Sequence, residues 1–351
     1  MFDKMDVIYE KGILMMHELK DILSRPLKDL RISVTDQCNF RCNYCMPKEI
    51  FDKDYPFLKK DELLSFDEMT RLASLFVTLG VRKIRITGGE PLLRKNLHQL
   101  IKQLSNLSSE LDIALTTNGV FLPQTAKLLK EAGLKRVNIS LDALDDQVFK
   151  KMNGRQIEVK KVLNGIATAK KENLEVKINM VVQKGVNDDQ ILKMAHYFKD
   201  RNITLRFIEF MDVGNTNGWK LSQVVPSREI YQLIHNQIPL EPLNSNYFGE
   251  VADRYRYKGT NVEVGFISSV TSPFCHSCTR ARISADGTLY TCLFSCSGVS
   301  LKKWLRSNYS DEYILEEMRK IWQKRHDRYS EMRSKFNSSK QKKIEMSYIG
   351  G

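Results

Sequence analysis

Six short runs rich in β-branched residues alternate with helical stretches between residues 30 and 236. The runs occupy 30–35, 83–87, 112–116, 136–140, 176–182 and 203–208. Their spacing is typical of βα units, in which helices connect parallel strands. The first connecting helix is well marked, because Ser65 and Glu68 form a capping-box pattern and Gly80 follows the last apolar position. Since no GxGxxG sequence is present, we expect an α/β fold built as a parallel barrel or partial barrel, with a doubly wound sheet as the less favoured alternative.

Polar and small residues follow five of these runs, where the expected strands end. The segments are Thr35-Asp-Gln-Cys38, Thr87-Gly-Gly-Glu-Pro91, Thr116-Thr-Asn-Gly119, Ser140-Leu-Asp142 and Glu209-Phe-Met211. Each alone is compatible with ordinary turn chemistry. Because the functional residues of a parallel barrel lie at the carboxyl ends of its strands, we interpret the five segments as one functional rim.

The alternation of β-branched runs with helical stretches ends near residue 245. Residues 247–270 resemble antiparallel strand, Asp286 and Gly287 are suited to a hairpin turn, and two helices are expected near 300–306 and 310–325. We therefore predict an N-terminal extension at 1–24, a barrel at 25–245 and a C-terminal region at 246–351. The extension is either a disordered leader or a segment that precedes a start at Met15 or Met16.

The chain is basic, with 55 Lys and Arg against 42 Asp and Glu, a net charge of +13 and a pI near 9.3. Such a balance favours anionic partners, namely nucleic acid, nucleotides or an anionic membrane surface. No apolar run approaches the ~20 residues that a membrane-spanning helix needs. Single-strand nucleic-acid binding favours aromatic side chains interleaved with cations, whereas the basic stretch 331–344 has one aromatic residue, Phe336.

The seven cysteines form two groups, and the N-terminus has no secretory signal. The groups are Cys38, Cys42 and Cys45, followed by Cys275, Cys278, Cys292 and Cys296. Clustered cysteines in a cytoplasmic protein indicate metal or redox chemistry rather than disulfides. Three thiolates on one loop can hold three irons of a cubane cluster and leave the fourth iron open, whereas a structural zinc ion usually takes four protein ligands.

The spacing of the second group favours a structural zinc ribbon, in which His276 could also replace a cysteine as a ligand. Arg280 and Arg282 follow the second cysteine at i and i+2 of an extended segment, so both side chains would project to the same side. That arrangement would hold a polyphosphate beside a metal site, although two exposed surface arginines are the simpler alternative.

Cations also stand inside the expected strands. They are Arg31, Lys83, Arg85, Lys177 and Arg206. A buried cation without a partner is costly, and one such residue could lie on an outward face. Five on four strands predict an electropositive barrel interior that binds a highly anionic ligand.

These patterns together resemble the radical S-adenosylmethionine (SAM) superfamily and, within it, the GTP 3′,8-cyclase family. The resemblance rests on SVTDQCNFRCNYCMP (33–47), IRITGGEPLLR (84–94), TTNG (116–119), NISLDAL (138–144), RFIEFMDVG (206–214), FCHSCTRARISADG (274–287) and the terminal Gly350-Gly351. It implies an α/β fold with an incomplete (βα)6 TIM-like barrel, whose open side is covered by the C-terminal region. It also implies SAM and two [4Fe–4S] clusters as cofactors, and a Gly-Gly tail that reaches into the active site.

The resemblance assigns residues to each ligand. Metal ligands would be Cys38, Cys42 and Cys45 for the first cluster, and Cys275, Cys278 and Cys292 for the second. SAM would contact Tyr44, Gly89, Glu90, Asn118, Ser140 and Met211. GTP would contact Arg31, Lys83, Arg85, Thr116, Lys177, Arg206, Arg280, Ala281 and Arg282, and the catalytic set would be Arg280, Arg282, Gly350 and Gly351.

The implied reaction is the first step of molybdopterin (molybdenum cofactor) biosynthesis. A 5′-deoxyadenosyl radical would remove the ribose 3′ hydrogen of GTP, and attack on guanine C8 would give (8S)-3′,8-cyclo-7,8-dihydroguanosine 5′-triphosphate. The implied partners are cyclic pyranopterin monophosphate synthase, which acts on the product, an external electron donor and a second copy in a homodimer, with neither nucleic acid nor membrane. The expected location is cytoplasmic.

Two alternatives stay open from the residues. Another radical SAM enzyme with an auxiliary cluster, such as a peptide-modifying maturase, would share the N-terminal half but would not need the strand cations or the Gly-Gly tail. A basic, metal-bearing nucleic-acid-binding module is the other. Cys296 departs from the family pattern, and we interpret it as a bystander thiol rather than a ligand that would close the second cluster.

Overall fold

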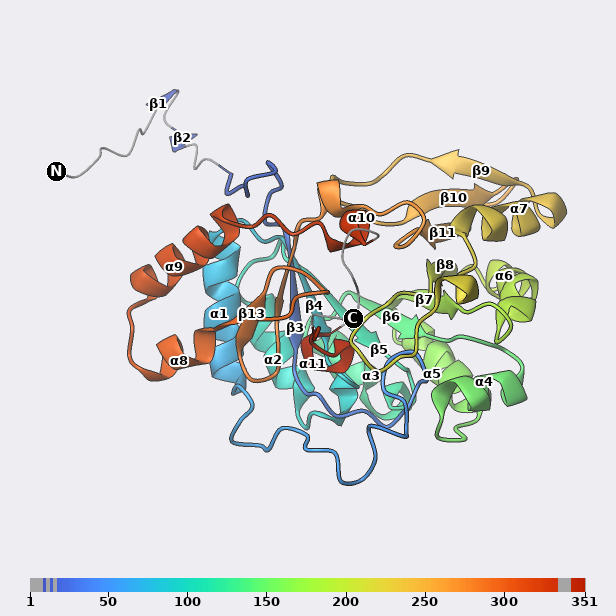
Figure 1. Cartoon of the computed structure of the whole chain (residues 1–351), viewed down its shortest axis with the longest axis horizontal. Helices are drawn as coiled ribbons and strands as arrows, with labels where there is room; N and C mark the ends of the chain where they lie inside the picture. The colour runs from blue at the N-terminus through green and yellow to red at the C-terminus, as the bar shows by residue number, and fades with distance from the viewer. Residues whose placement is uncertain (1–8, 11–12, 15–17, 334–341, 351) are drawn as a thin grey trace.

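The computed structural model describes residues 9–10, 13–14, 18–333 and 342–350. Within these residues, twelve strands form one mixed sheet (Figure 1), and β1 (Tyr9–Glu10) and β2 (Ile13–Leu14) form a separate antiparallel pair. The twelve strands are β3 (Asp29–Ser33), β4 (Lys83–Thr87), β5 (Asp112–Thr117), β6 (Arg136–Ser140), β7 (Glu175–Val182), β8 (Thr204–Glu209), β9 (Leu240–Leu243), β10 (Asp253–Tyr257), β11 (Glu263–Ile267), β12 (Arg280–Ile283), β13 (Thr288–Tyr290) and β14 (Val299–Ser300).

The six predicted strands are confirmed as β3 to β8, with each end within two residues of its predicted position. They pair in parallel and in chain order. The full order is β14-β13-β12-β3-β4-β5-β6-β7-β8-β11-β10-β9, and among the described residues no pairing joins its two edges. The sheet is therefore a partial barrel rather than a closed one, as the fold-class prediction states.

Strands of the C-terminal region extend both edges of the six-stranded unit. On one side β12 pairs in parallel with β3, and on the other β11 pairs in parallel with β8. The predicted antiparallel pairing after residue 245 is confirmed for β10 with β11, whereas the parallel pairing of β11 with β8 has no signal in the sequence. Because the hydrogen-bonded sheet is continuous through residue 245, the division into 25–245 and 246–351 stays a prediction.

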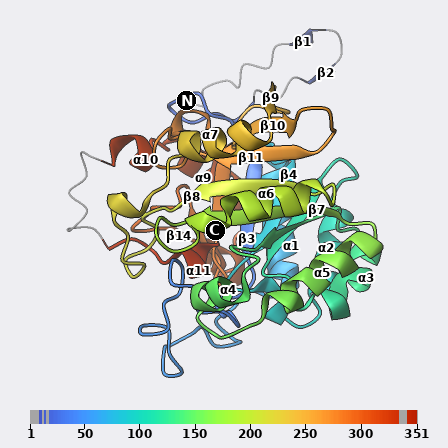
Figure 2. The same ribbon diagram turned by 90° about the vertical axis from the view of Figure 1, so that its right-hand side faces the viewer.

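Helices cover the outer face of the sheet, and Figure 2 shows α5 and α6 outside β7 and β8. The α-helices are α1 (Phe66–Thr78), α2 (Leu97–Ser105), α3 (Leu122–Glu131), α4 (Asp146–Asn153), α5 (Val159–Lys171), α6 (Ile191–Lys199), α7 (Ser227–Gln237), α8 (Leu301–Arg306), α9 (Asp311–Gln323), α10 (Tyr329–Met332) and α11 (Met346–Ile349). Short 3-10 helices are η1 (Pro91–Leu93), η2 (Asp188–Gln190), η3 (Leu221–Gln223) and η4 (Cys275–Ser277).

Local sequence explains where α1 begins and ends. The Ser65 side chain accepts from the Glu68 backbone N–H, and the Glu68 carboxylate accepts from the Ser65 backbone N–H at 2.7 Å, so the predicted capping box is formed. Gly80 follows with a φ of +110°, which turns the chain toward β4. The buried side of the helix packs into one continuous core with the outward-facing residues of the strands.

The last part of the predicted N-terminal extension is anchored. Leu19 and Asp21 are buried, and the Asp21 carboxylate pairs with Arg25 at 2.6 Å and with Arg325 at 3.2 Å. A disordered leader is therefore the wrong description of residues 18–24, because a buried ion pair connects them to the C-terminal region. Residues 1–8, 11–12 and 15–17 lie outside the described part of the chain.

The C-terminal region packs on two sides of the barrel. Helix α9 lies against α1, and α11 lies at the centre of Figure 1, in contact with β3. The helices predicted at 300–306 and 310–325 are confirmed as α8 and α9. Among the helices of the described residues, none has the length and apolar character that crossing a membrane requires.

Candidate active site

One cavity of about 390 Å³ follows the inner side of the parallel strands. Both groups of predicted metal-binding cysteines line it, at opposite ends. Cys38 follows the carboxyl end of β3, whereas Cys278 precedes the start of β12, which runs parallel to β3. Because β13 runs antiparallel to β12, Cys292 returns to the same end as Cys278. The strand cations therefore lie between two sulfur-lined ends.

A glycine turn after β4 supports the first cysteine loop. A Cβ atom on Gly88 would overlap the carbonyl oxygen of Thr35, and one on Gly89 would overlap that of Gln37. Backbone hydrogen bonds of 2.8 Å join Gly89 to Thr35 and Glu90 to Gln37. The turn and the loop can approach this closely only because no side chain separates them.

Glu90 is buried beneath this turn, and its carboxylate accepts three hydrogen bonds. Its carboxylate accepts from the Thr117 hydroxyl at 2.8 Å, the Asn118 backbone at 2.7 Å and the Leu92 backbone at 3.0 Å. Burial outweighs these bonds and raises the pKa of Glu90 to about 7. Such a carboxylate gains its charge most readily beside a cation, so it is suited to an ammonium group on a ligand.

Asp142 positions Tyr44 in the first cysteine loop. The Tyr44 hydroxyl donates to Asp142 at 2.8 Å, and the other carboxylate oxygen accepts from the Val181 backbone at 3.0 Å. Burial raises the pKa of Asp142 to about 6. The residue assignments drawn from the sequence missed this role, although Asp142 closes one of the five strand-end segments.

The three thiols of the first group fit an iron–sulfur cluster. Cys38, Cys42 and Cys45 all line the cavity, and burial raises the pKa of each. The Phe40 backbone N–H lies 3.3 Å from the Cys38 sulfur, in the position of a donor to a cluster thiolate. Buried thiols that would be costly to ionise alone are suited to binding a cationic metal. Within the described part of the chain no three His, Cys, Asp or Glu side chains converge closely enough to hold a single metal ion.

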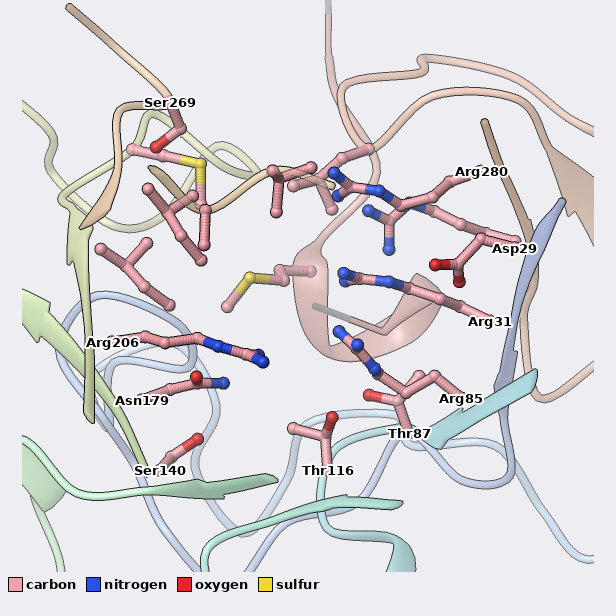
Figure 3. Close-up of a pocket in the computed structure, with 18 of the residues that line it drawn as sticks. Asp29, Arg31, Arg85, Thr87, Thr116, Ser140, Asn179, Arg206, Ser269 and Arg280 are labelled. Atoms are coloured by element: carbon pink, nitrogen blue, oxygen red, sulfur yellow. The ribbon is translucent and has the colours of Figure 1, made fainter. Parts of the chain in front are cut away.

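Three guanidinium groups form a row across adjacent strands. Arg282, Arg31 and Arg85 occupy matching register positions on β12, β3 and β4. Neighbouring strands are about 4.8 Å apart, so the three like charges lie close together. Burial, followed by Arg282 and Arg85, lowers the pKa of Arg31 well below its usual value. Figure 3 shows Arg31, Arg85 and Arg280 pointing into the cavity from one wall, toward Arg206 on the opposite wall.

These cations are not satisfied by the described protein groups. Buried nitrogens of Arg31, Arg85 and Arg280 have no hydrogen-bond partner, and neither does the Thr116 hydroxyl. Buried polar groups are nearly always hydrogen-bonded in native proteins. The buried guanidinium nitrogens of Arg31, Arg85 and Arg280 that have no partner are therefore the observation that most directly indicates an anionic ligand.

Two of the other predicted cations have protein partners. Lys83 lies 2.6 Å from the Tyr247 hydroxyl, and Lys177 lies 2.8 Å from Glu175. Burial and then Arg85 lower the pKa of Arg206 to about 10. All of these cations line the cavity, as predicted.

Sequence reasoning missed several other polar residues of the cavity. These are Asp29, Asp112, Arg136, Asn179, Asn246 and Glu250. Asp29 and Arg136 stand at the first positions of β3 and β6, and the alternating strand pattern could have indicated that they face inward. Asn246 and Glu250 lie in an irregular loop, which carries no such signal.

Cationic side chains hold the backbone of the second cysteine group. Arg25 donates to the Cys275 carbonyl at 2.7 Å, and Arg325 donates to the Cys278 carbonyl at 2.8 Å. Burial raises the pKa of Cys278, but Arg280 and Arg325 outweigh it and lower the pKa to about 7. Three inward-facing thiols beside these cations fit an anionic cluster.

The remaining candidate ligands of this region lie elsewhere. Cys296 is exposed and is not among the residues that line the cavity. His276 is exposed and pairs with Glu331 at 3.4 Å. The exposure of Cys296 and its absence from the cavity lining support its interpretation as a bystander thiol, which stays a prediction.

The glycine tail reaches the arginine row. Arg282 donates a hydrogen bond to the Gly350 carbonyl. A Cβ atom on Gly350 would overlap the Thr87 side chain, and its φ of +73° also favours glycine. Gly351 lies outside the described residues.

Most predicted ligand contacts are brought together, with one exception. Tyr44, Gly89, Asn118, Ser140 and Met211 line the cavity at its first-cysteine end. Ala281 does not line it. Because side chains alternate along β12, Ala281 points into the hydrophobic core while Arg280 and Arg282 face the cavity.

Two family matches divide the chain. Residues 32–198 match the Radical SAM superfamily, and residues 203–331 match Molybdenum Cofactor Synthesis C. The first match contains the cysteine loop and the glycine turn, and the second contains the other cysteine group.

Curated relatives match nearly the whole chain. A protein named GTP 3′,8-cyclase from Staphylococcus haemolyticus (strain JCSC1435) is 51% identical over 340 residues, which cover 96% of this chain and 100% of that protein. A protein of the same name from Staphylococcus aureus (strain MRSA252) has the same identity and coverage. A crystal structure of Streptococcus suis SuiB bound to S-adenosylmethionine has a TM-score of 0.60 at 16% identity, over 89% of this chain and 68% of that one, and supports the fold.

Proposed function

The chain belongs to the GTP 3′,8-cyclase family of radical SAM enzymes, which catalyses the first step of molybdenum cofactor biosynthesis, and from this premise we propose how its cavity binds the reactants. GTP is the substrate, and SAM with a [4Fe–4S] cluster is the cofactor set that the family implies. Cations line the cavity between its two cysteine-lined ends, and three of them have buried nitrogens without a partner; this is the observation that carries the proposal.

The triphosphate binds to the arginine row. Arg31, Arg85 and Arg282 supply its centre, and Arg280, Lys83, Lys177 and Arg206 flank it. Phosphate oxygens would complete the hydrogen bonds that Arg31 and Arg85 lack and would neutralise the like charges. With the triphosphate on the strands, the ribose faces the Cys38 end and guanine faces the Cys278 end.

The residues at the Cys38 end hold SAM and the first cluster. Cys38, Cys42 and Cys45 ligate three irons, and Glu90 with Asn118 accepts the amino group of SAM. Gly89, Tyr44, Ser140 and Met211 form the walls. When bound and reduced, the cluster and SAM supply the 5′-deoxyadenosyl radical that removes the ribose 3′ hydrogen before carbon–carbon bond formation at guanine C8.

A second [4Fe–4S] cluster binds at the opposite end. Cys275, Cys278 and Cys292 would ligate three irons and leave one open toward guanine. Arg25 and Arg325 fix the ligand-bearing backbone, and the nearby cations offset the negative charge of a cluster. Cys296 takes no part in this assignment.

Iron content tests the assignment of two clusters, and product formation tests the placement of GTP. Anaerobically reconstituted protein is expected to hold close to eight irons and little zinc per chain. With GTP, SAM and a low-potential reductant it should form 5′-deoxyadenosine together with the cyclic GTP product. Four irons with one zinc would overturn the second-cluster assignment, and deoxyadenosine without a cyclic product would contradict the placement of GTP.

The remaining expectations are proposals of the same kind. The downstream partner is cyclic pyranopterin monophosphate synthase, an external donor supplies electrons, and the functional unit is a homodimer, which light scattering of the reconstituted protein would test. A cytoplasmic location is supported by the six cysteine thiols that line the cavity, since a reducing compartment keeps thiols reduced.

A further inference from the structure

One buried carboxylate, that of Asp212, binds residues that come before and after positions 334–341 in the chain, ahead of the glycine tail. Asp212 lies in the loop after β8, and its carboxylate accepts from the Tyr329 hydroxyl at 2.6 Å and from Arg333 at 2.9 Å. The Lys343 ammonium lies 3.0 Å from the same carboxylate and donates to the Asp212 carbonyl at 2.6 Å. Asp212 and Lys343 are each more than nine-tenths buried.

The same loop also holds the backbone that leads to the tail. Asn215 exchanges two hydrogen bonds with the Lys343 backbone, at 2.5 and 2.9 Å. The Glu345 carboxylate accepts from the Asn215 backbone at 3.0 Å and from the Thr216 hydroxyl at 3.1 Å. Only α11 then separates these contacts from Gly350, whose carbonyl accepts from Arg282.

Asp212 is linked to both ends of the cavity, to one by its neighbour in sequence and to the other through contacts of Tyr329. It directly follows Met211, which lines the SAM end. The Lys343 ammonium lies over the Tyr329 ring at 4.7 Å, and Tyr329 stacks on Phe294 with ring centroids 4.4 Å apart. Phe294 follows Cys292 by two residues, so one cluster of contacts joins the SAM loop, the second cysteine group and the tail.

We propose that Asp212 is a positioning residue that sets the place of the C-terminal tail against Arg282 and thereby couples SAM cleavage to GTP cyclisation. The inference rests on the proposed function for the coupling, but not for the anchoring of the tail. Packing alone would not require an ionised carboxylate here, because the aromatic rings could be covered by an apolar side chain. The Asp212 carboxylate binds Arg333, which precedes positions 334–341, and Lys343, which follows them. It thereby fixes the position of the backbone from which the tail continues to Gly350.

Two variants remove the contact from opposite sides. Asp212→Asn keeps the shape but loses the charge, and Lys343→Met keeps an unbranched stem against Tyr329 without the ammonium. Glu68→Gln is the matched control, because it removes a 2.7 Å ion pair with Arg306 on the surface where α1 meets α8. None of the three residues lines the cavity.

Amide hydrogen exchange of residues 344–350 is the first measurement, made on the reconstituted protein. Both variants should exchange at least ten-fold faster there, while Glu68→Gln matches the wild type. Unchanged exchange in both variants would overturn the anchoring. Because this measurement needs no turnover, it decides the anchoring even if the wild type makes no cyclic product.

The ratio of 5′-deoxyadenosine to cyclic product is the second measurement. It should rise several-fold in both variants with iron content unchanged. The double variant should be no worse than Asp212→Asn alone, since the contact that Lys343→Met removes is one of those that Asp212→Asn already weakens. Faster exchange with an unchanged ratio would overturn the coupling role. If Asp212→Asn fails to fold, Lys343→Met alone decides the proposal by the same two readouts.

Discussion

At the scale of single residues, the arginine row should lower the stability of the unliganded fold while favouring the binding of an anionic ligand. Arg31 stands between Arg282 and Arg85 on neighbouring strands, and its charge is disfavoured by burial and by both neighbours. A chain selected for stability alone would place apolar side chains at these register positions. In the proposed binding mode, the row is a local cost in stability that a bound triphosphate offsets.

Replacing Arg31 separates the two effects. In Arg31→Met we expect GTP affinity to fall about 10- to 100-fold, since a charged hydrogen bond contributes roughly 1.5–3 kcal/mol. The unliganded variant should be as stable as the wild type or more so, because a repelled buried charge is removed. Equilibrium binding of GTP and thermal unfolding without ligand measure the two outcomes.

Arg256→Met is the control for Arg31→Met, because Arg256 pairs with Glu241 on the exposed side of β10 at 2.8 Å. It should change neither GTP binding nor, beyond a few tenths of a kcal/mol, stability. An Arg31 variant that unfolds at a lower temperature yet binds GTP normally would contradict the assignment and indicate a structural role.

At the scale of elements, the contact between the β4 turn and the first cysteine loop is decisive. Two segments more than 50 residues apart in the chain approach so closely that Gly88 and Gly89 have no room for a Cβ atom. The contact also places Glu90 beneath the loop, where Thr117 and Asn118 at the end of β5 bind it. Three consecutive strand ends thus form one unit of the rim.

Substitution of Gly89 tests this contact. Gly89→Ala should push the cysteine loop away from the turn and lower the free energy of unfolding by at least about 2 kcal/mol, because a methyl group would overlap the Gln37 carbonyl. The first cluster should be lost, so that iron falls from about eight to about four per chain. Iron analysis after reconstitution and thermal unfolding are the measurements.

Gly259→Ala is the control for adding a methyl group where there is room for it. Gly259 has a positive φ of +75°, which Gly89 does not, but an added Cβ atom meets nothing there. It should lose only about 1 kcal/mol and keep all its iron. Full iron content and normal SAM cleavage in Gly89→Ala would show that the close approach is not required.

At the scale of the whole molecule, the insertion of β12 beside β3 determines where the two cysteine groups lie. Because these strands run parallel, a group that follows β3 and a group that precedes β12 must be at opposite ends. The proposed binding mode follows from this arrangement, with GTP along the strands, its ribose toward the first cysteine group and its base toward the second.

The topology predicts the separation of the two clusters. Five residues of β3 and the turn to Cys38 span about 15–20 Å at roughly 3.3 Å per residue. Pulsed electron paramagnetic resonance of the doubly reduced protein should show a weak dipolar coupling of that size. The Cys278→Ser variant, which removes only the second cluster, should lose it. A strong exchange coupling, as in adjacent clusters, would contradict this arrangement.

The sequence alone predicted the strands, the first helix, and the cysteines and cations that line the cavity. These signals are local: β-branched runs, a capping box, and cysteines or cations at fixed spacing. Cations on alternating strand positions also indicated an inward face, because side chains alternate along a strand. The same rule explains why Ala281 fails as a side-chain contact, since it lies between two inward arginines.

Only the tertiary structure decided which distant segments meet. The pairing of β12 with β3, the bond between Tyr44 and Asp142, and the contacts of Asp212 with Arg333 and Lys343 each join residues far apart in the chain. No local sequence pattern predicts such pairs, because a buried carboxylate can accept a hydrogen bond from any donor that the fold brings near it. The residue types of this site were therefore determined by the sequence, whereas their order along one cavity, from thiols through cations to thiols, was determined by the strand order of the folded sheet.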